Sequence, residues 1–121
     1  MATSSDETKR IKQRFAVDLK AEISLAGQET QEHQCRITNL SASGACLHLE
    51  TILSCKIGMA VAIKLFLPAT VMHIPNSGEI MWTKQQHNGM HAGVRFKDNL
   101  SEIMMQRLVK NGLPENPYKP Q

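Results

Sequence analysis

Apolar and polar residues alternate over much of this chain. From Phe15 to Leu25 every second residue is apolar, and most residues between them are polar or charged. A period of two is typical of a strand with one buried and one solvated face. We therefore expect a long strand over residues 15–25. A turn at Ala26-Gly27-Gln28 and a more polar strand from Gln31 to Thr38 are expected to follow.

The same alternation returns in three later segments. Apolar residues occupy every second position from Ala45 to Leu49, from Met59 to Leu67, and from Met90 to Phe96. Ile80 and Trp82 are expected to share one face of another strand. Asn88-Gly89, between that strand and the last one, predicts a hairpin turn. The pattern thus indicates six or seven short strands, most of them joined by hairpins.

Two polar stretches interrupt the strands and are expected to be turns. Asn39–Gly44 consists of small, turn-forming residues apart from its leucine, and we expect it to introduce the third strand. Pro75–Gly78 is predicted to be a turn, after a short extended piece at Val71–Ile74. Pro68 is expected to end the strand before it, because proline cannot donate to a sheet ladder.

Only the end of the domain shows helical spacing. Asn99 and Glu102 resemble a capping box, and apolar residues from Leu100 to Leu108 fall on one helical face, with Met104 expected in the core. We predict a helix over residues 99–111 that closes one end of a small antiparallel barrel over residues 15–97. The fold class is all-β with a terminal helix. Residues 1–8 and 112–121 are predicted to be flexible tails.

Composition limits the function classes. The chain has 121 residues, enough for one domain with a core. A net charge of +3 permits an anionic partner without indicating nucleic acid. Three cysteines match no zinc spacing, and with no signal peptide at the start we expect them reduced and buried in a cytoplasmic protein. No apolar run approaches the ~20 residues of a membrane helix, so no membrane insertion is expected.

A basic segment precedes the first strand. "KRIKQR" places Arg10 and Arg14 four residues apart, with Lys9 and Lys12 beside them. The simplest interpretation is a solvated basic segment. Two arginines, however, can each bind a phosphate or a guanine edge through two hydrogen bonds. The segment is therefore a candidate site for a phosphorylated ligand.

"RIKQR" followed by "NLSASG" resembles the paired signature of the PilZ domain family, R-x-x-x-R and D/N-x-S-x-x-G. The resemblance extends to Gly58 before the fourth strand, to the tryptophan in "EIMWTK" and to "AGVRF" at Ala92–Phe96, and it covers Lys9 to Lys110. It implies a domain over residues 9–111, with the arginine motif at 9–14. The implied fold is a six-stranded antiparallel barrel plus a C-terminal helix.

The resemblance also implies a ligand, the bacterial second messenger cyclic di-GMP. Arg10 and Arg14 would bind its phosphates and guanine, and Asn39, Ser41 and Gly44 would contact it from the barrel. Asn39 replaces the aspartate that other members carry, so it offers one carbonyl oxygen and one amide donor to guanine.

Further ligand contacts are expected at three positions. Lys9, directly before the first arginine, is compatible in this family with an intercalated cyclic di-GMP dimer, whose phosphates Lys12 would also help to neutralise. Arg95 is a candidate if it points outward, as the alternation requires. Trp82 is expected to lie half in the core, and its stacking on the ligand is the less favoured interpretation.

No pattern in the sequence indicates catalysis or a metal. His87 and His91 flank the expected hairpin turn and are interpreted as solvated. The favoured hypothesis is a ligand-switched adaptor that relays cyclic di-GMP to an unidentified partner protein in motility, pilus or exopolysaccharide control. One alternative is a PilZ-like interaction module that binds no nucleotide. A third, a barrel that binds single-stranded nucleic acid, ranks last because aromatic residues are only 4% of the chain.

Overall fold

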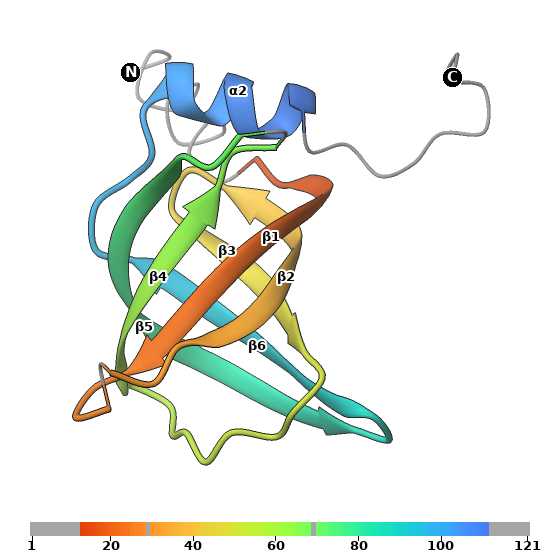
Figure 1. The fold of residues 1–121 in the computed structure, drawn as a ribbon, viewed down its shortest axis with the longest axis vertical. Helices are drawn as coiled ribbons and strands as arrows, with labels where there is room; N and C mark the ends of the chain where they lie inside the picture. The colour runs from red at the N-terminus through yellow and green to blue at the C-terminus, as the bar shows by residue number, and fades with distance from the viewer. Residues whose placement is uncertain (1–12, 29, 69, 112–121) are drawn as a thin grey trace, which may run out of the picture.

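The computed structural model describes residues 13–28, 30–68 and 70–111. Within these residues, six strands and one helix follow one another (Figure 1). They are β1 Phe15–Leu25, β2 His33–Ser41, β3 Gly44–Leu49, β4 Ala60–Phe66, β5 His73–Gln86, β6 Gly89–Phe96 and α2 Glu102–Asn111. The expected all-β fold with one terminal helix is confirmed.

The strands form a closed antiparallel barrel in the order β1-β2-β3-β6-β5-β4. β1 closes the barrel by pairing with β4, from Ala21 opposite Leu65 to Leu25 opposite Val61. Helix α2 lies across one end of the barrel, and the connection between β3 and β4 crosses the other end (Figure 1). This arrangement leaves the outer faces of β2, β3 and β6 uncovered by any described helix.

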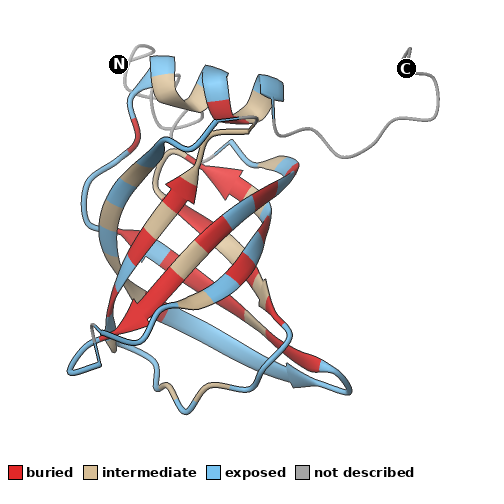
Figure 2. Cartoon of the chain, viewed as in Figure 1, coloured by how far each residue is buried: buried red, intermediate tan, exposed pale blue. Residues whose placement is uncertain are grey.

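The barrel interior is filled by the apolar residues that the alternation selects. Buried and exposed residues alternate along β1, as Figure 2 shows. The strand residues with the least exposed side chains are Leu19, Ile23, Ile37, Leu40, Leu47, Leu49, Ile63, Leu65 and Ile80. At 0.8 kcal/mol or so for each buried methylene group, this interior is the main source of stability.

The predicted boundary between the second strand and its following turn was wrong. β2 continues through Asn39 and Leu40 to Ser41, and only Ala42 and Ser43 form the turn before β3. Leu40 is fully buried, so its burial favours continuing the strand through a stretch whose other residues are turn-formers. Asn39 and Ser41 are therefore strand residues.

Pro75–Gly78 is also not a turn. These residues lie within β5 and pair with β4, from Pro75 opposite Lys64 to Gly78 opposite Val61. Pro75 has no partner in β6, since the β5–β6 pairing begins only at Gly78. Proline is tolerated in a strand where its missing N–H faces no neighbouring strand.

A register shift between Ile80 and Trp82 corrects another expectation. The two residues pair with the adjacent positions Val94 and Gly93, so β5 carries one extra residue here, a β-bulge. Ile80 is 1% exposed, whereas Trp82 is 41% exposed. The bulge therefore sends Trp82 to the outer face, and the expectation that it lies half in the core was wrong.

Helix α2 begins later than predicted. The Ser101 side chain accepts a hydrogen bond from the Met104 N–H at 3.2 Å, so Ser101, not Asn99, is the N-cap. Leu108 is fully buried, and Met105 packs against the core, a position that the sequence had suggested for Met104. No described helix is long and apolar enough to cross a membrane. The predicted tails, residues 1–8 and 112–121, lie outside the described residues.

Candidate functional site

A row of cross-strand neighbours runs over the outer face of five strands. Asn39 lies opposite Ala16 of β1 and Cys46 of β3, and Cys46 lies opposite Gly93 of β6. Gly93 in turn faces Trp82 of β5. Cross-strand neighbours have Cβ atoms about 5 Å apart, so the row brings two of the sequence-predicted residues, Asn39 and Trp82, onto one surface.

Asn39 reaches this surface through a second β-bulge. Ile37 and Leu40 are three residues apart, yet both are fully buried. The register of β2 against β3 shifts between Ile37 and Asn39, which lets Asn39 leave the core side. Its Oδ1 atom is buried and makes no hydrogen bond with any described residue. A buried carbonyl oxygen without a donor is costly, so Asn39 can accept a hydrogen bond from a ligand.

Arg14 extends over the same row from the residue before β1. Its Nη1 atom lies 3.9 Å from the Cys46 Sγ atom, the residue opposite Asn39. The side chain is exposed, and its other guanidinium donors are available to a ligand. The structure therefore brings Arg14 and Asn39 together. Lys9, Arg10 and Lys12 lie outside the described residues.

Ser41 and Gly44 lie opposite one another at the end of the β2–β3 hairpin. The Ser41 side chain is 1% exposed and its hydroxyl lies 3.3 Å from both the Gly44 carbonyl oxygen and the Ser43 hydroxyl. A Cβ atom on Gly44 would lie 2.4 Å from the Val94 carbonyl oxygen of β6. The glycine is thus required by the close approach of β6, and a ligand contact for Ser41 or Gly44 stays a prediction.

Arg95 points outward, as the alternation of β6 requires. It lies opposite Gly44 on one side and Glu79 of β5 on the other. Its Nη2 atom forms an ion pair with the Glu79 carboxylate, and both side chains are partly exposed. An exposed pair of this kind contributes little to stability, so Arg95 can exchange Glu79 for a ligand phosphate at small cost.

Trp82 covers the outer side of Gly93. A Cβ atom on Gly93 would lie 2.1 Å from the indole Nε1 atom, so only glycine leaves room for the ring. The indole therefore lies close against the β6 backbone while remaining 41% exposed. This places an aromatic surface at the β5 end of the row that begins near Arg14.

The three cysteines do not share one environment. All are free thiols, but only Cys35 is buried, and Cys46 and Cys55 are partly exposed. The expectation of three buried cysteines was therefore wrong. Burial, together with the nearby Glu22 carboxylate, raises the pKa of the Cys35 thiol to about 12. Burial also raises the pKa of Cys55, by a smaller amount.

We expect these environments to separate the thiols in an alkylation experiment. At pH 8 iodoacetamide should modify Cys46 quickly and spare Cys35, because a pKa raised to about 12 leaves almost no thiolate at Cys35. Mass spectrometry of the digested protein measures the two rates. Denatured protein is the control, in which both thiols should react. Equal rates in the folded protein would contradict the described burial.

The two histidines near the last hairpin lie in different environments and do not form a metal site together. His87 is exposed in the turn, whereas His91 lies in β6 with its ring 4.9 Å from that of His48. Among the described residues, no group of three or more His, Cys, Asp or Glu side chains could hold a metal ion.

Sequence reasoning missed Cys46, Gly93 and Glu79. None of them belongs to the two motifs that drew attention to the site. Each becomes visible only through strand register, because each is the cross-strand neighbour of a residue that the motifs or the alternation had selected. Knowing the pairings of β2 with β3 and of β5 with β6 would have been enough to find them.

Comparisons with known proteins identify the fold. The chain resembles the PilZ domain of YcgR from Escherichia coli, solved with c-di-GMP, at 18% identity and a TM-score of 0.62, over 81% of this chain and 86% of that one. It also resembles the Bacillus subtilis inhibitor of motility MotI/DgrA, at 17% identity and a TM-score of 0.60 over 80% of this chain. The Borreliella burgdorferi PlzA protein in complex with c-di-GMP gives 20% identity and a TM-score of 0.56 over 92% of this chain.

The chain spans only 46% of MotI/DgrA and 44% of PlzA, so these similarities concern one domain of each. No curated protein matches the sequence significantly. The sequence model of the PilZ domain does match, over residues 8–111, a range that contains the whole barrel, the helix and both motifs. The chain therefore belongs to the PilZ domain family.

Proposed function

We propose that this chain is a receptor for cyclic di-GMP that binds the nucleotide on the outer face of β2, β3 and β6. One observation carries the proposal: the buried Oδ1 atom of Asn39, unpaired among the described residues, lies in the same row as Cys46, over which the Arg14 guanidinium extends. A guanine nucleotide offers a hydrogen-bond partner to each of these two groups. Guanine N1–H or N2–H can donate to Asn39, and a phosphate can accept from Arg14.

The other predicted residues have complementary roles in this proposal. Arg10 binds the second phosphate, and Lys9 adds charge if two nucleotides intercalate. Trp82 offers a ring for stacking, and Arg95 adds a phosphate contact once it leaves Glu79. Ser41 and Gly44 hold the hairpin that carries Asn39 and contact the ligand from it. The YcgR PilZ domain and PlzA were both solved with c-di-GMP, which supports the choice of ligand.

The proposed activity is sensing, not catalysis. Folding of the arginine segment over the nucleotide would change the surface that the domain offers to a partner protein. Coupling of this kind, in which ligand contacts order a segment, is a common switching mechanism. The similarity to an inhibitor of motility supports a partner in the motility machinery of a bacterial cytoplasm.

Isothermal titration calorimetry with cyclic di-GMP tests the proposal, with GTP and cyclic di-AMP as controls. We expect saturable binding of cyclic di-GMP alone, at a stoichiometry of one or two nucleotides per chain. Absence of binding by a folded protein would contradict the proposal and favour the alternative, an interaction module that binds no nucleotide.

Asn39→Ala should weaken cyclic di-GMP binding without weakening the fold. The side-chain oxygen makes no hydrogen bond with a described residue, so its removal relieves the cost of burying it and should not lower the free energy of unfolding. Loss of one hydrogen bond to guanine should cost about 1 kcal/mol of binding free energy. Calorimetry and urea denaturation measure the two quantities. Gln34→Ala, an exposed position on the same strand, is the control and should change neither.

A further inference from the structure

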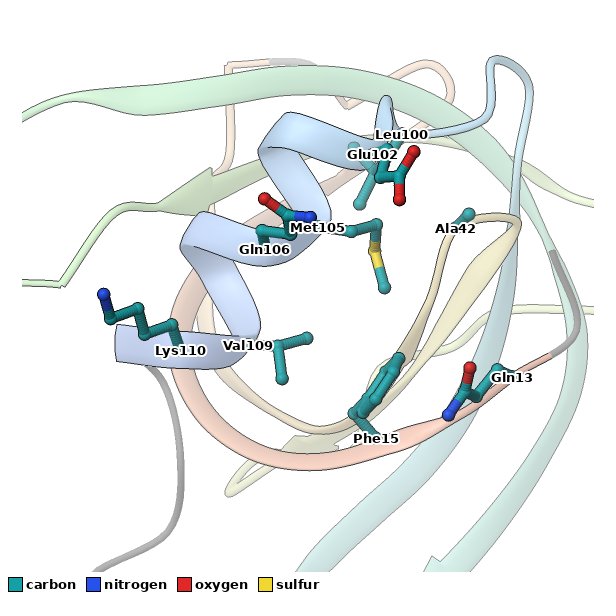
Figure 3. Close-up of a pocket in the computed structure, with 9 residues that line it drawn as sticks. All are labelled: Gln13, Phe15, Ala42, Leu100, Glu102, Met105, Gln106, Val109 and Lys110. Atoms are coloured by element: carbon teal, nitrogen blue, oxygen red, sulfur yellow. The ribbon is translucent and has the colours of Figure 1, made fainter. Parts of the chain in front are cut away.

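A groove of about 610 Å³ lies between α2 and the rim of the barrel (Figure 3). Its apolar side chains come from three places, the start of β1, the segment before α2, and the inner face of α2. They are Phe15, Leu100, Met105 and Val109. Figure 3 shows Met105 and Val109 pointing from the helix into the space above Phe15. The groove is therefore an apolar surface next to the arginine motif.

The chain lies along this groove where it enters β1. Gln13 and Phe15 both line it, and they are two residues apart where the chain enters β1. In an extended chain, residues two apart lie on the same side. Residue 11 is the next position on that side, and it is an isoleucine, the only large aliphatic residue between Met1 and Phe15. The alternation thus assigns Ile11 to the groove side.

The same alternation assigns three of the four cations of this segment to the opposite side. Arg10, Lys12 and Arg14 are the even-numbered residues of the segment, and Arg14 already lies over Cys46 on the outer face. One side of the segment would therefore face the apolar groove while the other carries the charges toward the nucleotide. In such a segment, burial of the apolar side chain in the groove would fix the position of the charged side chains.

Charge at the groove favours the same occupant. Glu102 and Lys110 line it from the two ends of α2, and among the described lining residues only Glu102 is acidic. The segment from Lys9 to Arg14 carries four cations. Electrostatic attraction therefore favours a path past Glu102 at the start of the helix, and repulsion by Lys110 disfavours a path past its end.

We propose that Ile11 docks in the groove between α2 and β1 and acts as the anchor that holds Arg10 and Arg14 over the ligand face. The effect of this anchor on nucleotide affinity rests on the proposed function; the docking itself does not. Because docking and nucleotide binding involve the same short segment, each should strengthen the other. Ile11 is thus a positioning residue for the arginine motif.

Leu113 is the rival occupant. It lies four residues after Val109, beyond the described end of α2, and could approach the groove from the other side. The substitutions Ile11→Ser and Leu113→Ser therefore make a matched pair. Both replace one aliphatic side chain by a small polar one in a segment next to the groove.

Methyl NMR of the full chain tests the docking directly. We expect nuclear Overhauser effects from the Ile11 methyl groups to Met105 and Val109, present without nucleotide and stronger with saturating cyclic di-GMP. Contacts from Leu113 in place of Ile11, or no contacts from Ile11 in either condition, would overturn the proposal. This measurement decides the docking even if the protein proves not to bind cyclic di-GMP.

Affinity gives the second test. Ile11→Ser should weaken cyclic di-GMP binding about tenfold, since losing the burial of one aliphatic side chain is worth at least one factor of ten. Leu113→Ser should bind as the parent does. The melting temperature of Leu113→Ser should match that of the parent, whereas Ile11→Ser should melt at a slightly lower temperature, because it loses the burial of a docked side chain and leaves the barrel core intact. An Ile11→Ser protein that binds with parental affinity would show that Ile11 does not anchor the arginines.

Discussion

Replacing Arg10 and Arg14 together by alanine should reduce cyclic di-GMP affinity by at least a hundredfold. Each guanidinium is expected to make a charged hydrogen bond to a phosphate, worth at least ~1.5 kcal/mol. The sum, about 3 kcal/mol, corresponds to a factor of more than one hundred. Calorimetry measures the loss. Arg14 is exposed, and its one hydrogen bond to a described residue is with Cys46 at 3.9 Å, so we expect its removal to leave the fold intact.

Two controls separate a specific contact from general charge. Arg14→Lys keeps the charge but loses the paired donors, and it should recover only part of the affinity. Arg36→Ala removes an exposed cation of β2 that is paired with Asp18 of β1. This variant should bind cyclic di-GMP as the parent does. Affinity should also fall as salt rises. A double variant that binds normally, or binding that ignores salt, would place the ligand elsewhere on the protein.

Gly44→Ala should destabilise the fold by about 2 kcal/mol, within the range for overpacking a close contact. The new methyl group would lie 2.4 Å from the Val94 carbonyl oxygen. That oxygen belongs to the backbone of β6, which pairs with β3 along its length, so it cannot move without disturbing the ladder. Urea denaturation of parent and variant measures the difference in the free energy of unfolding.

Gly27→Ala is the matched control, because no atom of the described residues lies within 4 Å of a Cβ atom there. Its cost should come only from the positive φ of 82° and amount to about 1 kcal/mol. Gly44→Ala protein that is as stable as the parent would mean that β3 and β6 are not as close as described. The affinity of the Gly44→Ala variant for cyclic di-GMP, measured well below its melting temperature, tests separately whether Gly44 also contacts the ligand.

The alternation of apolar residues predicted most of the fold because a barrel buries one face of every strand. It failed where a strand carries an extra residue. The bulges at Asn39 and near Trp82 move every later residue of the strand to the opposite side of the sheet. No residue type marks such a bulge in the sequence in the way that particular residues mark a hairpin turn or a helix cap. Pro75–Gly78 failed for another reason: its residues favour turns locally, and pairing with β4 overrides that preference.

The candidate site was only half predictable. The motifs named Arg14 and Asn39, since each contributes a functional group that its neighbours in sequence do not. They did not reveal that Cys46 lies beside both groups, or that Glu79 pairs with Arg95, because those relations depend on which strands are adjacent. β3 pairs with β6 and not with the next strand β4, and the sequence carries no signal for that non-consecutive pairing.

The turn at Ala42-Ser43 has a consequence for how a signal leaves the domain. The Ala42 carbonyl oxygen accepts a hydrogen bond from the Leu100 N–H, and the Ser43 carbonyl oxygen accepts one from the Phe96 N–H, both at 2.8 Å. Leu100 lies two residues before α2. The β2–β3 hairpin, which would contact the ligand, and the segment before α2 are thus joined by a hydrogen bond. A displacement of this turn would move the segment before α2 or break these hydrogen bonds, so the proposed ligand face and the start of the helix are coupled.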